Sequence, residues 1–81
     1  MSEQRSIIVH AVLDKQAKVW VATSSDVPGL ATEAPSFDLL VPKLQAMIPE
    51  LLDANGYTDS DEIHFKVIGE VNDIVAFREA V

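Results

Sequence analysis

Two histidines, His10 and His64, are the side chains of this sequence whose charge changes nearest to neutral pH. Each lies in a stretch with the composition of a β-strand, and if these strands are neighbours, both imidazoles point to the same face of the sheet. Such a pair could bind a metal ion or form a pH-sensitive contact at an interface. Two ligands without a nearby third make a poor metal site, so we favour hydrogen-bonded structural histidines and predict no metal site.

Carboxylates are the other groups that could perform acid–base or metal chemistry here. Asp14, Asp26, Asp59 and Asp61 all lie in predicted loops, and no acid lies between residues 63 and 69. We interpret them as solvated loop acids, with Asp26 stabilising a turn. We therefore predict no catalytic residue, no cofactor and no enzymatic activity. A metal-dependent hydrolase built from the loop acids and the histidines is the alternative.

The composition is that of one small acidic domain. The chain has 81 residues, with 13 Asp and Glu against 6 Lys and Arg, and a formal net charge of -7. A chain of this length has room for one core, so we predict a single domain over residues 1–81, with a core at about residues 5–71 and no separate DNA-binding domain. An acidic surface repels phosphate, so we expect no direct binding of nucleic acid and consider a basic protein the better partner.

The absence of cysteine excludes disulfides and thiolate metal sites and fits a reducing compartment. The longest apolar run, Ile7–Leu13, is too short to span a bilayer, and no signal peptide is recognisable after Met1. We therefore predict a cytoplasmic protein without membrane contact.

Three strands are predicted in the first half of the chain. In Arg5–Leu13 the side chains alternate between two largely apolar faces, which is typical of a central strand. A polar loop over Asp14–Ala17 leads to a returning strand over Lys18–Thr23. A short third strand over Leu30–Ala34 is polar enough for a sheet edge. Together they predict an antiparallel meander.

The connection Ser24–Gly29 contains a turn with a physical mechanism. Proline fixes φ and glycine supplies a positive φ, so Pro28 and Gly29 fit the central positions of a type II turn. The segment Asp26–Leu30 could also be a recognition loop. Because turn geometry alone accounts for both residues, we favour the structural role.

Residues Phe37–Ala54 have the apolar spacing of an amphipathic helix, with Ser36 as its N-cap. Pro42 and Pro49 are seven residues apart and lie opposite the apolar stripe, where carbonyls without helical donors can reach water. The alternative is a helix broken at Pro42. Asn55-Gly56 is a suitable C-terminal cap.

The last third of the chain returns to the sheet. Glu62–Val71 alternates between apolar and polar residues, as expected of a half-buried strand. We interpret the helix as a right-handed crossover that returns this strand beside the first one and parallel to it. The tail after Asn72-Asp73 is compatible with a short strand over Ile74–Phe77 or with a helix, and the sequence leaves both open.

The predicted fold is α+β, with the element order β-β-β-α-β and a mixed sheet in the order 3-2-1-4. One helix covers one face of this sheet, so the other face needs a second protomer or another partner to bury it. Trp20 is either an anchor on that uncovered face or part of the core beside the helix. We expect a homodimer, with a candidate interface that comprises Ile8, His10, Val12, Trp20, His64 and Ile68.

The order of these segments resembles the HicB-like family. In that family, a strand with an aromatic residue, an Asp-x-Pro-Gly turn, a short strand and a helix follow one another. Here they correspond to Val19–Ala22, Asp26–Leu30, Ala31–Ala34 and a helix that closes with Ile48–Gly56. This form is similar to short HicB-like proteins classed as a domain of unknown function. The resemblance covers approximately Ile7–Ile68.

The resemblance implies a partial ribonuclease-H-like fold and the role of an antitoxin that blocks a small basic ribonuclease toxin, HicA. A ribonuclease-H enzyme needs a metal-binding carboxylate in the middle of its first strand, where this chain has Val9-His10. Many HicB proteins also bind their operator through a C-terminal segment, for which we see no room before Val81. We therefore expect a non-enzymatic protein-interaction module, with a stand-alone homo-oligomeric domain of unknown role as the alternative.

Overall fold

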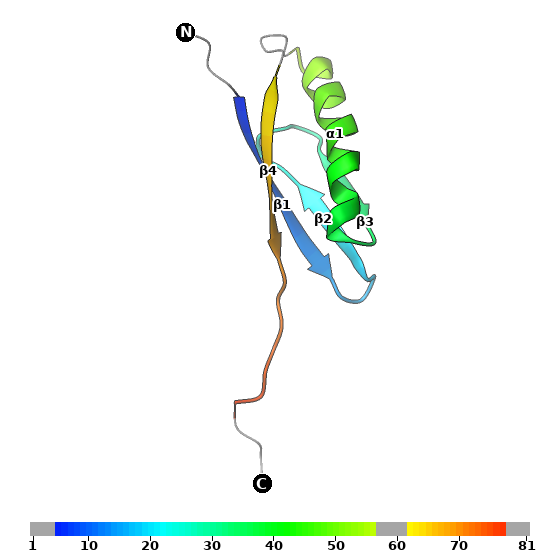
Figure 1. Ribbon diagram of the computed structural model, residues 1–81, viewed down its shortest axis with the longest axis vertical. Coiled ribbons are helices and arrows are strands. Elements are labelled where there is room, and N and C mark those ends of the chain that lie inside the picture. Colours follow the sequence, from blue (N-terminus) through cyan, green and yellow to red (C-terminus); the bar gives the residue numbers. More distant parts are fainter. Residues whose placement is uncertain (1–4, 57–61, 78–81) are drawn as a thin grey trace.

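The computed structural model describes residues 5–56 and 62–77, in which the elements follow the order β-β-β-α-β (Figure 1). The strands form one sheet, and the helix packs along it. After the last strand, the chain extends away from the sheet as an arm. The elements are β1 (Arg5–Asp14), β2 (Val19–Thr23), β3 (Ala31–Ala34), α1 (Phe37–Ala54) and β4 (Ile63–Glu70).

The sheet has the strand order β3-β2-β1-β4. β1 pairs antiparallel with β2 and parallel with β4, and β2 pairs antiparallel with β3. A parallel pair needs a crossover connection, which α1 supplies between β3 and β4. The predicted α+β class and the 3-2-1-4 order are therefore confirmed.

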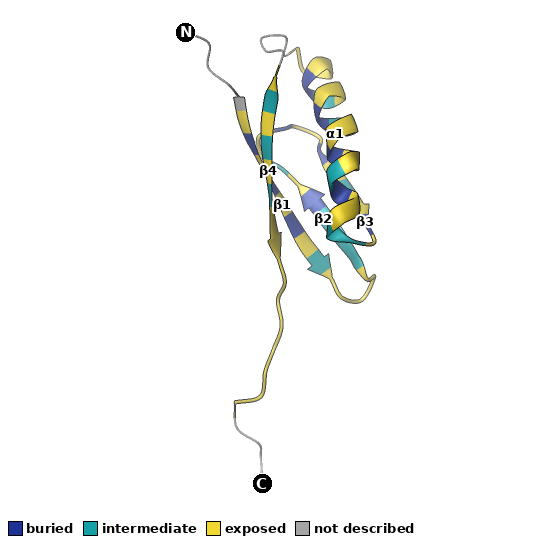
Figure 2. Cartoon of the chain, in the orientation of Figure 1, coloured by how far each residue is buried: buried dark blue, intermediate teal, exposed yellow. Residues whose placement is uncertain are grey.

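The hydrophobic core lies between α1 and one face of the sheet. On β1, Ile7, Val9 and Ala11 are completely buried, whereas Ile8, His10 and Val12 are exposed. This alternation follows from the pleat of a strand, in which successive side chains point to opposite faces (Figure 2). The other buried residues are Ala22, Val27, Leu30, Ala34, Leu40, Leu44, Ile48 and Leu52.

Helix α1 is continuous through both of its prolines. At its start, the Ser36 hydroxyl accepts a hydrogen bond from the backbone N–H of Leu39 at 3.3 Å. Pro42 and Pro49 lie inside the helix and are exposed to solvent. Carbonyls that lose a helical donor at these positions can therefore bind water. The prediction of a continuous helix is confirmed, and the helix is not broken at Pro42.

The turn before β3 has the predicted form. The backbone N–H of Leu30 donates to the carbonyl oxygen of Val27 at 3.1 Å, and Gly29 has a φ of +87°. A positive φ directly after proline is characteristic of a type II turn. β3 begins at Ala31, one residue later than predicted, because Leu30 still closes the turn.

The tail after β4 differs from both alternatives left open by the sequence. Val71–Phe77 has neither strand nor helix structure, and every residue in it is exposed. The physical reason is that β1, the strand beside β4, ends here. β1 pairs with β4 as far as Val12 and Glu70, and after Asp14 the chain turns into the hairpin, so the tail has no neighbouring strand to pair with. The predicted acidic loop 57–61, with Asp59 and Asp61, lies outside the described residues.

Candidate protein-interaction face

The face of the sheet turned away from α1 is called the open face here. Residues that are paired across neighbouring strands share a face, so the register determines which side chains meet there. Its strand residues remain accessible to solvent: Ile8 is 40% exposed, Val12 38% and Ile68 43%. The open face comprises Ile8, His10 and Val12 of β1, Val21 and Thr23 of β2, and His64, Lys66, Ile68 and Glu70 of β4.

His10 lies at the centre of the open face. Its register partners are Ile68 on β4 and Thr23 on β2. Ile8 and Val12 stand two residues away on the same strand, on the same face as His10. The predicted interface residues of β1 and β4 thus share one face, on which the apolar side chains Ile8, Val12 and Ile68 surround His10 among polar and charged neighbours.

The two histidines share the open face but do not form a pair. His10 is the register partner of Ile68, whereas His64 is the partner of Ser6. Four residues separate the two positions along the strands, which corresponds to about 13 Å. His64 instead has its Nε2 3.0 Å from Oε1 of Glu62. Within residues 5–56 and 62–77, no group of three potential metal-ligating side chains is present.

Trp20 lies on the helix side of the sheet and not on the open face. It is the register partner of Leu13, on the buried side of β1, and its ring contacts Phe37 edge-on, with centroids 5.1 Å apart at an interplanar angle of 81°. Of the two roles considered for Trp20, packing beside the helix is therefore the correct one. Its placement in the candidate interface was wrong, because the pleat directs it to the other face.

Gly69 makes room for this aromatic pair. A Cβ atom at this position would lie 2.8 Å from Cε2 of Phe37 and 3.3 Å from Cζ3 of Trp20. Only glycine lets both rings approach the backbone of β4 at this distance. Sequence reasoning missed this role, although an isolated glycine inside a strand pattern signals close approach.

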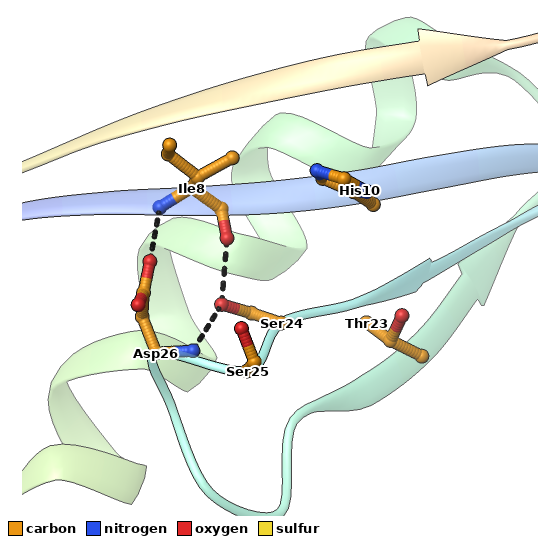
Figure 3. Close-up of a pocket in the computed structure, with 6 residues that line it drawn as sticks. All are labelled: Ile8, His10, Thr23, Ser24, Ser25 and Asp26. Atoms are coloured by element: carbon orange, nitrogen blue, oxygen red, sulfur yellow. Dashed lines mark hydrogen bonds between the residues drawn. The ribbon is translucent and has the colours of Figure 1, made fainter.

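Asp26 and Ser24 bind the connection after β2 to the middle of β1 (Figure 3). Oδ2 of Asp26 accepts a hydrogen bond from the backbone N–H of Ile8 at 2.9 Å. The hydroxyl of Ser24 donates to the carbonyl oxygen of Ile8 at 2.7 Å and accepts from the backbone N–H of Asp26 at 3.1 Å. We call this set of hydrogen bonds the Ile8 clamp.

The Ile8 clamp replaces a missing pair of the β1–β2 ladder. The last pair of that ladder is His10 and Thr23, so continuation of the register would place Ser25 opposite Ile8. The chain instead leaves the sheet, and the side chains on either side of Ser25 satisfy both backbone groups of Ile8. The Asp26 side chain, expected to stabilise a turn, thus has its hydrogen-bond partner on another strand.

A pocket of about 380 Å³ lies beside the Ile8 clamp. Ile8 and His10 form one wall, and the chain that leaves β2 forms the other (Figure 3). Its lining combines the apolar side chain of Ile8 and the imidazole of His10 with hydroxyl groups and the carboxylate of Asp26, and it opens on the open face. The pocket is lined by Ile8, His10, Thr23, Ser24, Ser25 and Asp26.

Asp14 also has a structural role. Its Oδ1 accepts hydrogen bonds from the backbone N–H groups of Gln16 and Ala17, each at 3.1 Å. It therefore shapes the hairpin between β1 and β2. Asp59 and Asp61 lie outside the described residues. Asp14 was predicted in the loop but is the last residue of β1. Like Asp26, it accepts hydrogen bonds from backbone N–H groups.

The arm Val71–Phe77 carries the most exposed large apolar side chains of the described residues. Ile74 is 92% exposed, Val75 88% and Phe77 94%. The base of the arm is held at the hairpin, where Nζ of Lys15 lies 2.9 Å from Oδ1 of Asp73. Lys15, together with the backbone N–H of Ile74, lowers the pKa of Asp73.

The structure defines a small α+β domain with a four-stranded sheet that a helix covers on one face. The family described as a domain of unknown function (DUF1902) matches residues 6–77, and the chain belongs to this family. A hypothetical protein, TTHA1013, from the extremely thermophilic bacterium Thermus thermophilus has a similar crystal structure. It is 44% identical, with a TM-score of 0.67, and the match covers 90% of this chain and 100% of TTHA1013. No curated protein matches the chain.

The family match agrees with the predicted membership in a domain of unknown function. It extends to residue 77 and thus includes the arm as well as the sheet and the helix. Among the described residues, no helix is long and apolar enough to cross a membrane.

Proposed function

We propose that this chain is a non-enzymatic protein-interaction module of the cytoplasm, which forms a homodimer and masks a small basic protein. The observation that supports the proposal best is the open face. Ile8, Val12 and Ile68 are between 38% and 43% exposed on a sheet whose other face is packed against α1. Large apolar side chains held on rigid strands are suited to binding another protein.

A second copy of the chain is a suitable cover for the open face. Removal of apolar surface from water contributes about 25 cal/mol per Å². In a two-fold symmetric dimer, each copy offers the other the same apolar surface. A domain of 81 residues has a small core of its own, so burial of this face would add substantially to its stability.

The acidic charge supports a basic second partner. Asp38, Glu50 and Asp53 are exposed on α1, where Lys43 is the basic residue. With 13 acidic against 6 basic residues, the whole chain attracts cations and repels nucleic acid. The resemblance to HicB antitoxins suggests a small ribonuclease toxin of the HicA type as this partner, with inhibition by steric masking. No cofactor is required for this role.

The homodimer is tested by sedimentation of purified variants. We expect Ile68→Gln to weaken the dimer at least about tenfold, because it places an amide in an apolar contact. Leu39→Gln is the matched control, since Leu39 is 50% exposed on α1 and lies outside the open face. Equal dissociation constants for the two variants would refute dimerisation through the open face.

The basic partner is tested by affinity capture from the native cell extract at low and high salt. We expect a small basic protein that salt releases, because exposed charges are screened within about 10 Å at 0.1 M salt. That protein is then purified, and its ribonuclease activity is measured with and without this chain. Loss of activity on addition of the chain supports the antitoxin role. Unchanged activity, or the absence of such a protein, contradicts it.

The same experiments separate the alternatives. A dimer that captures no basic protein would identify a stand-alone homo-oligomeric domain. A metal-dependent hydrolase predicts a higher melting temperature with Mg²⁺, Mn²⁺ or Zn²⁺, because a ligand that binds the folded state stabilises it. We expect no such shift.

A further inference from the structure

We propose that the arm Val71–Phe77 of one copy binds the open face of a second copy and places Phe77 in the pocket beside the Ile8 clamp. This inference deepens the proposed homodimer, on which it rests. It names the segment that covers the open face and the site that receives its aromatic ring.

The arm carries large apolar side chains that are almost fully exposed to solvent within their own copy. Ile74, Val75 and Phe77 are between 88% and 94% exposed, although they are three of the most apolar residue types. The arm continues the direction of β4 and points away from the sheet (Figure 1). An extended apolar segment of this kind is suited to recognition by a complementary surface.

The open face offers that complement. Ile8, Val12 and Ile68 provide exposed apolar surface, and the pocket of about 380 Å³ adds a concave site with Ile8 and His10 on one wall. A cavity of about 150 Å³ is large enough to bind benzene, so the pocket has room for the ring of Phe77. Thus the same chain carries both an exposed aromatic side chain, Phe77, and a pocket that can accept it.

The arm cannot reach the pocket of its own copy while its base is held. The register continues from Val12 and Glu70 to Lys15 and Asp73, which agrees with the 2.9 Å ion pair between them. From Lys15 back to Ile8 the distance along the strand is about 23 Å. The four residues from Asp73 to Phe77 span at most about 14 Å. A second copy can supply the arm without this restriction.

The residues of the arm that would contact the second copy carry no charge that would oppose binding. The chain is acidic, with a net charge of -7, so two copies repel each other on average. Within Val71–Phe77, however, Asp73 is the only charged residue, and it is paired with Lys15. The residues that would enter the second copy, 74–77, are uncharged.

The chain has no cysteine, so engineered cysteines can test the contact directly. Copies with Ala76→Cys are mixed with copies with Ser25→Cys and oxidised. Ala76 leaves Phe77 in place, and Ser25 lines the pocket outside the clamp bonds. We expect a disulfide that joins position 76 of one copy to position 25 of the other, identified by mass spectrometry of the linked peptides, because two copies of the same variant joined together would have nearly the same total mass. Glu50→Cys, on the exposed side of α1, replaces Ser25→Cys in the control and should yield at least about tenfold less product.

A chain with both Ala76→Cys and Ser25→Cys tests whether the arm binds the pocket of its own copy. A disulfide within one copy, at the mass of the single chain, would overturn the proposal. If sedimentation shows a dimer but no cross-link forms to Ser25→Cys, the arm exchange is wrong and the proposed homodimer stands. If the protein is monomeric throughout, both are wrong.

The apolar side chains of the arm are tested separately. Phe77→Gln should raise the dissociation constant of the dimer at least about tenfold. Because Phe77 is 94% exposed in the single copy, this variant should keep the melting temperature of the monomer at low concentration. Leu39→Gln serves again as the matched control. An unchanged dissociation constant for Phe77→Gln would overturn the assignment of its ring to the pocket.

Discussion

Asp26 accepts a hydrogen bond from the backbone N–H of Ile8 at 2.9 Å, although 18 residues separate them in the sequence. This bond and that from Ser24 to the Ile8 carbonyl take the place of a strand pair. They fix the connection after β2 against the central strand. The same contact forms one side of the pocket on the open face.

Loss of the Asp26 carboxylate should destabilise the domain. We expect Asp26→Ala to lower the free energy of unfolding by about 1–2 kcal/mol, since the N–H of Ile8 loses its acceptor. Asp26→Asn should cost less, because the amide oxygen can still accept the bond. Ser25→Ala is the control. Urea denaturation measures all three variants, and an equal effect of Asp26→Ala and Ser25→Ala would show that the clamp contributes no stability.

Gly29 is required by the turn before β3. With a φ of +87°, it has a backbone conformation that residues with a Cβ atom adopt at a cost of about 1–2 kcal/mol. A Cβ here would lie 3.6 Å from Cδ2 of Leu51, an ordinary contact, so the cost arises in the backbone. We expect Gly29→Ala to be less stable than Gly29→Asn, because asparagine tolerates positive φ better. Thermal unfolding that ranks them in reverse would contradict this explanation.

Gly69 provides the space in which Trp20 and Phe37 meet. Gly69→Ala should lower stability by about 1–3 kcal/mol, because its Cβ would displace the ring of Phe37. The fluorescence of Trp20, the single tryptophan, should change with it. In a double-mutant cycle, Phe37→Leu should reduce the cost of Gly69→Ala. Additive effects would show that Gly69 and Phe37 do not interact.

The base of the arm should respond to acid. Lys15 first, and then the backbone N–H of Ile74, lower the pKa of Asp73. A carboxyl group with a lowered pKa in the folded state contributes its contact above its ordinary pKa and loses it as the pH falls through the lowered value. We therefore expect the Lys15–Asp73 contact to persist at neutral pH and to be lost only in acid more extreme than the ordinary aspartate pKa of about 3.9.

NMR titration of the Asp73 carboxyl group measures this effect. Lys15→Gln should raise its midpoint, whereas Lys18→Gln, which changes a lysine of the same hairpin outside this contact, should leave it unchanged. A midpoint that is insensitive to Lys15→Gln would show that the ion pair does not hold the arm in solution.

Several features of this protein were predictable from its sequence alone. Alternation along residues 5–14 separated Ile7 and Val9 from Ile8 and His10, and the spacing over Phe37–Ala54 identified the helix. Pro28 and Gly29 determined the turn. These are short-range patterns, because they depend on the period of a strand or helix and on the φ values of single residues.

The tertiary structure decided which of these residues meet. The register between β1 and β4 separated His10 from His64, and the pleat of β2 directed Trp20 to Phe37. The partner of Asp26 and the exposure of the arm beyond the end of β1 also became visible only in three dimensions. The reason is that a side chain's face is set by its own strand, whereas its neighbours depend on how separate strands align and where each one ends.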